Sequence, residues 1–265
     1  MTEFITLPNI FKPHRCNKLI RLGKNNDGGY VVEEDSVLKS KTLLSFGIDH
    51  DWSFEEDFYN KSKCIVHSYD GSVGPLFFLR KIKLRIYKLL TSPNKDYFEV
   101  SKYWFKLPIK FYKFFNIINK TKGPNHYEKF VGDGEKYTSL DETLNNLPIS
   151  NDIFLKIDIE GGEYILLDDI LKKEMIFTGI VIEFHEVSKH VEKIKNFIYM
   201  LNLKLVHLHI NNYATITPGG IPEVMELSFS RNGDSDYFQN KLPHKLDQNN
   251  DPDSWSYELS FETDV

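Results

Sequence analysis

Short apolar runs alternate with amphipathic stretches from Lys41 to the region of Ser230, and this alternation limits the fold more than any other feature. Strands of a parallel sheet are nearly continuous in apolar residues, whereas crossover helices repeat them every three or four positions. The pattern therefore predicts an α/β protein. We assign strands to residues 43–48, 64–69, 128–132, 153–158, 179–185, 204–210 and 223–230, and helices to residues 53–61, 164–171 and 191–201.

The connection between the last two predicted strands differs from the others. It contains TPGGIP at 217–222, which has turn chemistry and is too short for a crossover helix. These two strands should therefore pair antiparallel. We expect a Rossmann-like sheet of seven strands, mostly parallel, with an antiparallel last strand.

The 265 residues fit a single domain with three additions. Residues 1–40 contain RLGKNNDGGYVV, whose Asp-Gly-Gly turn predicts an N-terminal hook or hairpin laid against the sheet. Residues 74–122 form an insertion between the second and third strands. Residues 232–265 form a C-terminal loop and tail, in which the polar part up to residue 254 predicts a surface loop.

The insertion carries 12 Lys or Arg residues and only two acids, although the formal charge of the whole chain is −5. A basic block inside an acidic body predicts an anionic partner, whether a phosphorylated small molecule, a membrane surface or nucleic acid. Its interleaved basic and aromatic residues are typical of an interfacial helix or a nucleic-acid groove. A helical cap that packs its apolar side chains on the domain explains the same pattern.

A glycine turn closes the first predicted strand, in FGIDHD at 46–51. Gly47 lets the backbone approach a ligand, and ligands of open α/β sheets bind beyond the carboxyl ends of the strands. The second strand ends at Asp70 and Gly71, about 20 residues later, where a carboxylate can accept hydrogen bonds from ribose hydroxyls or cap its own loop. We expect Phe46, Gly47, Asp49, Asp70 and Gly71 to bind a cofactor.

The composition of this turn favours a methyl donor over a dinucleotide. A pyrophosphate needs the G-x-G-x-x-G loop, whereas this turn has one glycine. Asp49 and Asp51 would repel a pyrophosphate but suit a sulfonium cofactor with an α-amino group. S-adenosyl-L-methionine is therefore the expected cofactor, and Asp133 after the third strand is expected to accept from its adenine amino group.

Carboxylates and imidazoles follow the next strands. Asp158 and Glu160 end the fourth strand in KIDIEGGE, and residues spaced by two on a strand share a face. Glu183 and His185 end the fifth strand in IEFHE, and His209 lies in HLHINN of the sixth. We expect these groups to converge at one edge of the sheet, with Asp158 and Glu160 also contacting the cofactor.

Six segments of the sequence together match a known family: NDGGYVV at 26–32, LLSFGIDHDWSFEEDF at 43–58, LKIDIEGGEYILL at 155–167, IEFHE at 182–186, HLHINN at 207–212 and LPHKLDQNNDP at 242–252. In these segments, and over nearly its whole length except the insertion, the chain resembles the FkbM-type family of methyltransferases. The resemblance implies a Rossmann-like class I methyltransferase that uses S-adenosylmethionine, acts most often on sugar hydroxyls, and places Gly47, Asp70 and Asp158 at the cofactor.

A sugar hydroxyl is a weak nucleophile, so a base that takes its proton would assist attack on the methyl group. We assign this role to His185 or His209, whose type titrates near neutrality, with Asp158 and Glu183 as orienting groups. The basic insertion predicts a nucleotide-linked or otherwise anionic sugar, with Arg80 and Arg85 on its phosphates. Asp27, Tyr30 and Asn211 complete the expected acceptor site.

Two other functions remain open from the sequence. The Asp, Glu and His residues are acceptable ligands for a divalent ion, so a metal-dependent hydrolase is one alternative, and an ion that assists methyl transfer is a milder version. A membrane-surface binding module, with peripheral contact through residues 74–122, is the other. No metal ligand is assigned, no nucleic acid is expected as a partner, and homo-oligomerisation is left open. The N-terminus lacks a targeting signal, which predicts a cytoplasmic protein.

Overall fold

A seven-stranded sheet organises the computed structural model, which describes residues 2–91, 95–115, 123–148, 151–234, 237–238 and 242–262. The strand order is β11-β12-β10-β9-β4-β5-β6, and β12 is antiparallel to both of its neighbours while the other pairs are parallel. The strands are β4 (Thr42–Phe46), β5 (Ile65–Tyr69), β6 (Asn125–Tyr127), β9 (Ile153–Ile157), β10 (Phe177–His185), β11 (Lys204–Ile210) and β12 (Val224–Ser230).

This topology confirms the predicted fold class. Numbered in chain order within this sheet, the first six strands follow the order of a doubly wound Rossmann sheet, and the seventh, β12, is inserted antiparallel between the fifth and sixth. That arrangement is the Rossmann-like methyltransferase fold. The expected antiparallel pairing of the last two strands is also present, between β11 and β12.

The third strand lies elsewhere than predicted. Residues 128–132 were expected to form it, but the sheet uses β6, and β7 (Phe130–Val131) pairs instead with β8 (Tyr137–Thr138) in a separate ribbon. The prediction followed the two apolar residues of β7. An edge strand such as β6 needs no continuous apolar run, so its Asn-His-Tyr sequence carries no strand signal.

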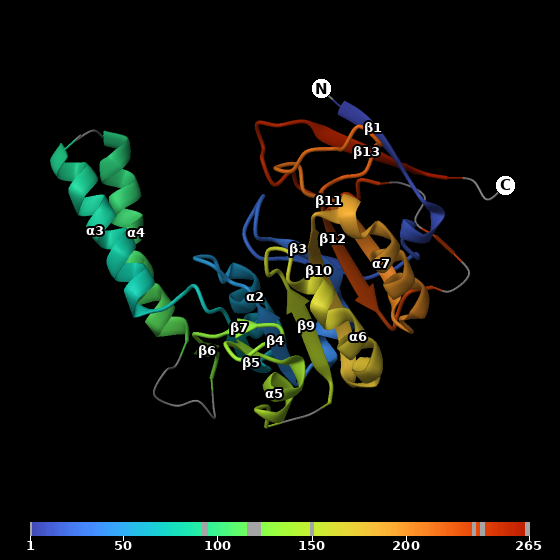
Figure 1. Ribbon diagram of the computed structural model, residues 1–265, viewed down its shortest axis with the longest axis horizontal. Coiled ribbons are helices and arrows are strands. Elements are labelled where there is room, and N and C mark those ends of the chain that lie inside the picture. The colour runs from blue at the N-terminus through green and yellow to red at the C-terminus, as the bar shows by residue number, and fades with distance from the viewer. Residues whose placement is uncertain are drawn as a thin grey trace.

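Helices cover both faces of the sheet (Figure 1). On one face α1 (Glu34–Lys39) and α2 (Ser53–Ser62) pack with Leu43 of β4, and on the other face α5 (Leu140–Asn145), α6 (Glu163–Lys173) and α7 (Val187–Met200) pack with Leu44. The two leucines are consecutive on the strand and point to opposite faces. A strand covered on both faces is buried along its whole length, as β4 is.

The two ends of the chain pack beside the sheet. Within residues 1–40, β2 (Leu19–Leu22) and β3 (Tyr30–Glu33) pair as an antiparallel hairpin. β1 (Thr2–Leu7) pairs in parallel with β13 (Ser256–Phe261), so the tail returns to the N-terminal strand. Short 3-10 helices, η1 (Asn9–Phe11) and η2 (Glu174–Ile176), complete the described elements.

The insertion forms a helical hairpin of α3 (Pro75–Thr91) and α4 (Lys95–Phe114), which stands away from the sheet in Figure 1. Its base is anchored by an aromatic cluster in which Phe78 and Phe111 pack with Trp52 and Ile48 of the β4–α2 loop. Beyond this base most large side chains of the hairpin are exposed. Residues 92–94 and 116–122 of the insertion lie outside the described residues.

The C-terminal loop is more than a surface loop. Asn250 is buried, and the Asp247 side chain is almost completely buried against His207 of β11. The polarity of this segment therefore reflects hydrogen bonding to buried polar groups of the sheet, which composition cannot distinguish from contact with water. Residues 235–236, 239–241 and 263–265 lie outside the described part. No helix among the described residues is long and apolar enough to span a membrane.

Candidate active site

A cavity of about 970 Å³ opens at the carboxyl ends of β4, β5, β9 and β10. This is the edge at which open α/β sheets bind ligands. The β2–β3 hairpin and the turn before β8 contribute further walls. Eleven of the sixteen predicted site residues line the cavity: Asp27, Tyr30, Gly47, Asp49, Asp70, Asp133, Asp158, Glu160, Glu183, His185 and Asn211.

The loop after β4 depends on Gly47. Its φ of +78° lies in the left-handed region, and a Cβ atom at this position would lie 1.6 Å from the Asp158 carbonyl oxygen. The Asp158 N–H in turn donates to the Phe46 carbonyl at 2.9 Å, so the ends of β4 and β9 are in direct contact. No other residue type allows this approach, which brings the cofactor loop and Asp158 to the same cavity.

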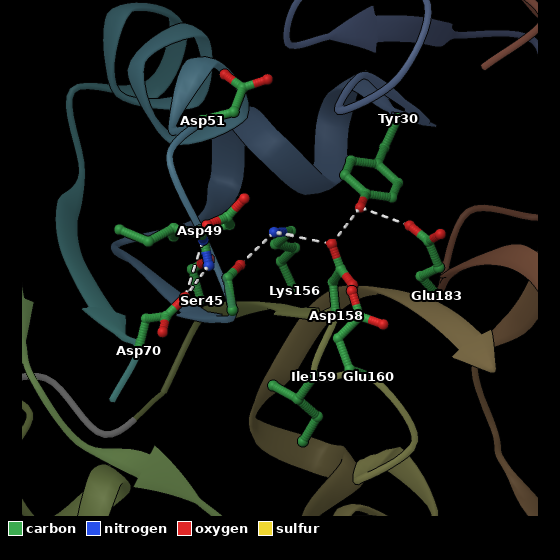
Figure 2. Close-up of polar contacts among 12 residues, drawn as sticks. Tyr30, Ser45, Asp49, Asp51, Asp70, Lys156, Asp158, Ile159, Glu160 and Glu183 are labelled. Atoms are coloured by element: carbon green, nitrogen blue, oxygen red, sulfur yellow. Dashed lines mark hydrogen bonds and ion pairs between the residues drawn. The ribbon is translucent and has the colours of Figure 1, made fainter. Parts of the chain in front are cut away.

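Asp70 holds this loop in place. Its Oδ2 atom accepts from the amides of Ile48 and Asp49 at 2.9 and 2.8 Å (Figure 2). Its Oδ1 atom accepts from the Ser72 amide and hydroxyl at 2.8 and 2.6 Å. A carboxylate has about four lone-pair sites, and these four bonds use them. The ribose contact expected for Asp70 therefore requires that a ribose hydroxyl replace the Ser72 hydroxyl.

One amide at the N-terminus of α2 already has a carboxylate partner. Asp51 Oδ1 accepts from the Ser53 amide at 3.1 Å, and Asp51 Oδ2 pairs with Lys24 Nζ at 2.8 Å. A pyrophosphate would need such helix N-terminal amides free and no carboxylate beside them. The geometry thus agrees with the preference for a methyl donor over a dinucleotide.

Lys156 is a central site residue that the sequence analysis missed. It is almost fully buried in β9, donates to the Gly47 carbonyl at 2.5 Å and lies 3.8 Å from both Glu55 and Asp158. Burial by itself would lower the pKa of Lys156, but the charges of Glu55 and Asp158 reverse the effect and raise it. A lysine inside an otherwise apolar strand was the available signal.

Tyr30 joins the two carboxylates of the site (Figure 2). Its hydroxyl lies 2.9 Å from Asp158 Oδ2 and 2.8 Å from Glu183 Oε2, and Asn211 Nδ2 donates to Glu183 Oε1 at 2.9 Å. One hydroxyl can donate only one hydrogen, so a second proton is needed to satisfy both carboxylates. Burial, followed by the nearby Asp158 charge, raises the pKa of Glu183 to about 8 and keeps that proton on Glu183.

His185 is held by a second missed residue, Glu163. Its Nδ1 atom lies 2.8 Å from Glu163 Oε1, while its Nε2 atom faces the cavity 3.9 Å from Glu183 and 3.6 Å from Glu160. Burial would lower the pKa of His185, but the hydrogen bond and charge of Glu163 raise it to about 9. Glu163 lies in the first turn of α6 and is completely buried.

His209 does not reach the cavity, so its predicted convergence with the other groups is wrong. The prediction assumed that the fifth and sixth strands are neighbours, but β12 lies between them and pairs Glu226 with both Glu183 and His209. His209 Nε2 instead lies 2.9 Å from Asn250 Oδ1, and burial lowers its pKa.

Four other predicted residues also lie away from the cavity. Phe46 is buried below the loop against Tyr69, and the Phe130 ring covers Gly71. Arg80 is exposed on α3, and Arg85 stacks over Trp104 at 5.6 Å. The expected phosphate contacts of both arginines are therefore not formed at this edge, because α3 packs on α4 rather than over the cavity.

The cavity is acidic. Among its lining residues are eight carboxylates and three lysines, and two of the lysines, Lys24 and Lys156, are committed to ion pairs. A net negative lining attracts a cationic ligand and disfavours an anionic one. S-adenosylmethionine carries a sulfonium and an ammonium group, so the chemistry of the lining fits this cofactor.

A second cavity, of about 620 Å³, adjoins the first and shares Lys24, His50 and Asp51 with it. Its outer wall is the base of α4, which contributes Tyr103, Lys110 and Lys113 among other residues. His50 stacks on Trp104 of α4, with ring centroids 5.3 Å apart. The part of the insertion that reaches the site is thus its lysine-bearing base.

Comparisons with known proteins do not assign an activity. No family model matches the chain, and no curated protein does. Among solved structures, the Methanococcus jannaschii fibrillarin pre-rRNA processing protein matches 75% of this chain and 70% of its own at 12% identity, with a TM-score of 0.38. A Galdieria sulphuraria protein assigned as a sarcosine dimethylglycine methyltransferase matches 75% of this chain and 81% of its own at 7% identity, with a TM-score of 0.37. At such low similarity the activity of this chain has to be argued from its own site.

Proposed function

We propose that this chain is an S-adenosylmethionine-dependent O-methyltransferase of the FkbM type that acts on a hydroxyl of an anionic sugar. The observation that carries the proposal is the acidic cavity at the strand ends of a methyltransferase fold, into which His185 points with its far side held by Glu163. The carboxyl ends of the sheet strands form the edge at which the cofactor would bind. The dyad of His185 and Glu163 supplies a base beside that edge.

The cofactor would be held by the loop that Asp70 orders. Asp49 extends from this loop into the cavity, and Ser72 lies where a ribose hydroxyl can be recognised. Asp133, on the turn before β8, is exposed in the cavity wall and is assigned to the adenine amino group. When bound, the cofactor supplies the methyl group on a sulfonium centre.

His185 is assigned as the base that takes the proton of the acceptor hydroxyl. Glu163 orients the ring so that Nε2 faces the cavity, and its charge stabilises the imidazolium that forms when the proton is taken. Tyr30, Asp158 and Glu183 form one hydrogen-bonded unit beside it, which fixes the position of the acceptor. Such positioning can lower the barrier of an in-line displacement by about 7–11 kcal/mol.

The second cavity is the proposed binding site for the phosphate of the anionic sugar. Lys110 and Lys113 at the base of α4 replace Arg80 and Arg85 as its proposed phosphate contacts. A phosphate there would lie outside the acidic main cavity but adjacent to it, so an anionic sugar could span both. Exposed lysine contacts are screened over about 8 Å at physiological salt, so they should weaken with ionic strength.

Calorimetry and methyl transfer test the proposal in two stages. We expect the wild-type protein to bind S-adenosylhomocysteine but not nicotinamide dinucleotides, and to transfer labelled methyl faster to nucleotide-linked sugars than to the free sugars. His185→Ala should keep cofactor binding and lose roughly 10²–10⁴-fold in turnover. The double variant Lys110→Ala and Lys113→Ala should slow methyl transfer to the nucleotide-linked sugars and leave transfer to the free sugars unchanged. Absence of S-adenosylhomocysteine binding would overturn the proposal.

A metal-assisted reaction is the second candidate, favoured by one specific observation. Asp158, Glu183 and His185 each offer a ligand atom, and these atoms lie within 4.8 Å of one another. Metal-binding histidines commonly bind a carboxylate through the other ring nitrogen, as His185 does. Calorimetry and methyl transfer repeated after treatment with a chelator distinguish this candidate from metal-free methyl transfer. Methyl transfer or hydrolase activity that is lost with the chelator and returns with Mg²⁺ or Mn²⁺ would favour the metal-assisted reaction.

A further inference from the structure

The hairpin of α3 and α4 carries an unusual share of the exposed apolar surface. Of 24 large hydrophobic side chains that are exposed in the described part of the chain, 12 belong to these two helices. Single exposed apolar residues are normal on a protein surface, whereas apolar residues gathered on one part of it mark an interaction site. The site described above uses only the base of the hairpin, so the distal part has no assigned role.

On α3 the exposed apolar residues form a stripe. Leu76, Leu79, Ile86 and Leu90 follow the three- and four-residue spacing of one helical face, and Leu90 is 79% exposed. The opposite face contacts α4: Phe77 packs on Trp104 at 6.0 Å between ring centroids. The stripe is therefore not the contact surface within the hairpin.

On α4 a second stripe has the same character. Phe98, Phe105, Ile109 and Tyr112 are all exposed, with Ile109 at 69%. The buried face of this helix carries Trp104, Leu107 and Phe111, which anchor it to the domain. Each helix thus uses one apolar face for folding and leaves another uncovered.

Basic residues accompany both stripes. Residues 75–114 contain ten Lys or Arg and two acids, and Lys83 interrupts the α3 stripe at the position between Leu79 and Ile86. On α4, Lys102 and Lys106 flank the exposed aromatic residues. Long lysine side chains keep their charge at the surface while their stems cover apolar neighbours.

This combination fits an anionic lipid surface better than other partners. Protein interfaces are depleted in lysine at their centre, whereas these stripes have lysines within and beside them. Nucleic acid would pair with the lysines and stack on aromatic residues but would leave the exposed Leu76, Leu79, Leu90 and Ile109 without a partner. An interfacial helix uses both groups, since it buries leucine and phenylalanine below the headgroups and pairs lysine with them.

We infer that the α3–α4 hairpin docks the protein peripherally on membranes that contain anionic phospholipid. The apolar stripes enter the headgroup region and the lysines bind the lipid phosphates. The base of α4 also lines the second cavity, so docking places the candidate site close to the lipid surface. The inference does not depend on which reaction the site performs.

Vesicle flotation of the full-length protein tests the inference. We expect it to float with vesicles of phosphatidylglycerol and phosphatidylcholine, to remain unbound with phosphatidylcholine alone, and to bind less at high salt. Leu79→Gln combined with Leu90→Gln should weaken binding about tenfold or more, since each leucine loses burial of its whole side chain. Glutamine keeps the helix propensity of these exposed positions, so the fold should be retained.

The matched control is Met175→Gln combined with Tyr199→Gln. These side chains are 74% and 83% exposed but lie in η2 and α7, so the control should bind vesicles like the wild-type protein. Equal flotation of the two double variants would overturn the inference, as would equal binding to neutral vesicles. Concentration-dependent dimers that the Leu79→Gln and Leu90→Gln changes abolish, without vesicle binding by the wild type, would assign the stripes to a second copy of the chain instead.

Discussion

At the scale of single residues, the candidate site depends on how Glu163 tunes His185. Because Glu163 raises the pKa of His185 to about 9 despite burial, the ring holds a proton at neutral pH in the cofactor-free protein. The protonated ring cannot accept another proton, so kcat/KM should rise with pH toward an inflection near 9. Glu163→Gln removes the charge that stabilises the imidazolium, so the inflection should move to lower pH and the plateau rate should fall by about tenfold or more.

The measurement is the pH dependence of methyl transfer under kcat/KM conditions for wild type, Glu163→Gln and His185→Ala. If the role of Glu163 is purely structural, Glu163→Gln lowers the rate but leaves the inflection of the pH profile where it is in wild type. That outcome would contradict the proposal that Glu163 tunes His185. S-adenosylhomocysteine affinity of the same variants shows whether the cavity is intact.

At the scale of elements, the contact between the ends of β4 and β9 depends on Gly47. Gly47→Ala should destabilise the protein for two reasons: alanine at φ +78° is strained, and its Cβ would overlap the Asp158 carbonyl oxygen. Gly220→Ala is the matched control, since Gly220 has the same φ of +78° and open space around it, and should lose only about 1–2 kcal/mol. The free energy of unfolding of both variants is measured in urea. The extra loss in Gly47→Ala over Gly220→Ala is the cost of the overlap with the Asp158 carbonyl. Equal losses would mean that the ends of β4 and β9 separate at little cost.

At the scale of the whole molecule, protons on buried acids link stability to pH. Burial is the main cause that raises the pKa of Glu183 and of Glu226 to about 8, from 4.5 in the unfolded chain. These two acids therefore bind protons in the folded protein that they lose on unfolding, and this contribution to stability falls as pH rises through 8. Below pH 6.5, His67 and His126, whose pKa burial lowers to about 4, act in the opposite direction. His185, raised to about 9, acts in the same direction above its ordinary value of 6.5.

Thermal unfolding midpoints measured from about pH 7 to about pH 9, above the range in which the histidines titrate, should accordingly decline. Glu226→Gln removes one ionisation and keeps an oxygen to accept from Asn250 Nδ2, which donates to Glu226 at 3.0 Å. This variant should be more stable than wild type at the alkaline end and less sensitive to pH. A midpoint that stays level or rises over the range would show that these carboxyls are ionised in the folded protein.

The sequence by itself determined the fold class, six of the seven sheet strands and eleven of the residues that line the cavity. Apolar periodicity reports burial on one face or on both, and strand ends of a parallel sheet meet at one edge, so Gly47, Asp158 and His185 were found without a structure. The same reasoning located the hairpin of the N-terminus, because its turn chemistry is local.

Only the tertiary structure decided which partner each polar group has. Insertion of β12 beside β10 moved His209 away from the cavity, and the packing of α3 on α4 kept Arg80 and Arg85 from it. Lys156 and Glu163 became site residues because buried charges from distant segments surround them. A one-dimensional pattern records whether a residue is covered, whereas pairing of charges depends on which strands become neighbours, and that is settled only when the sheet assembles.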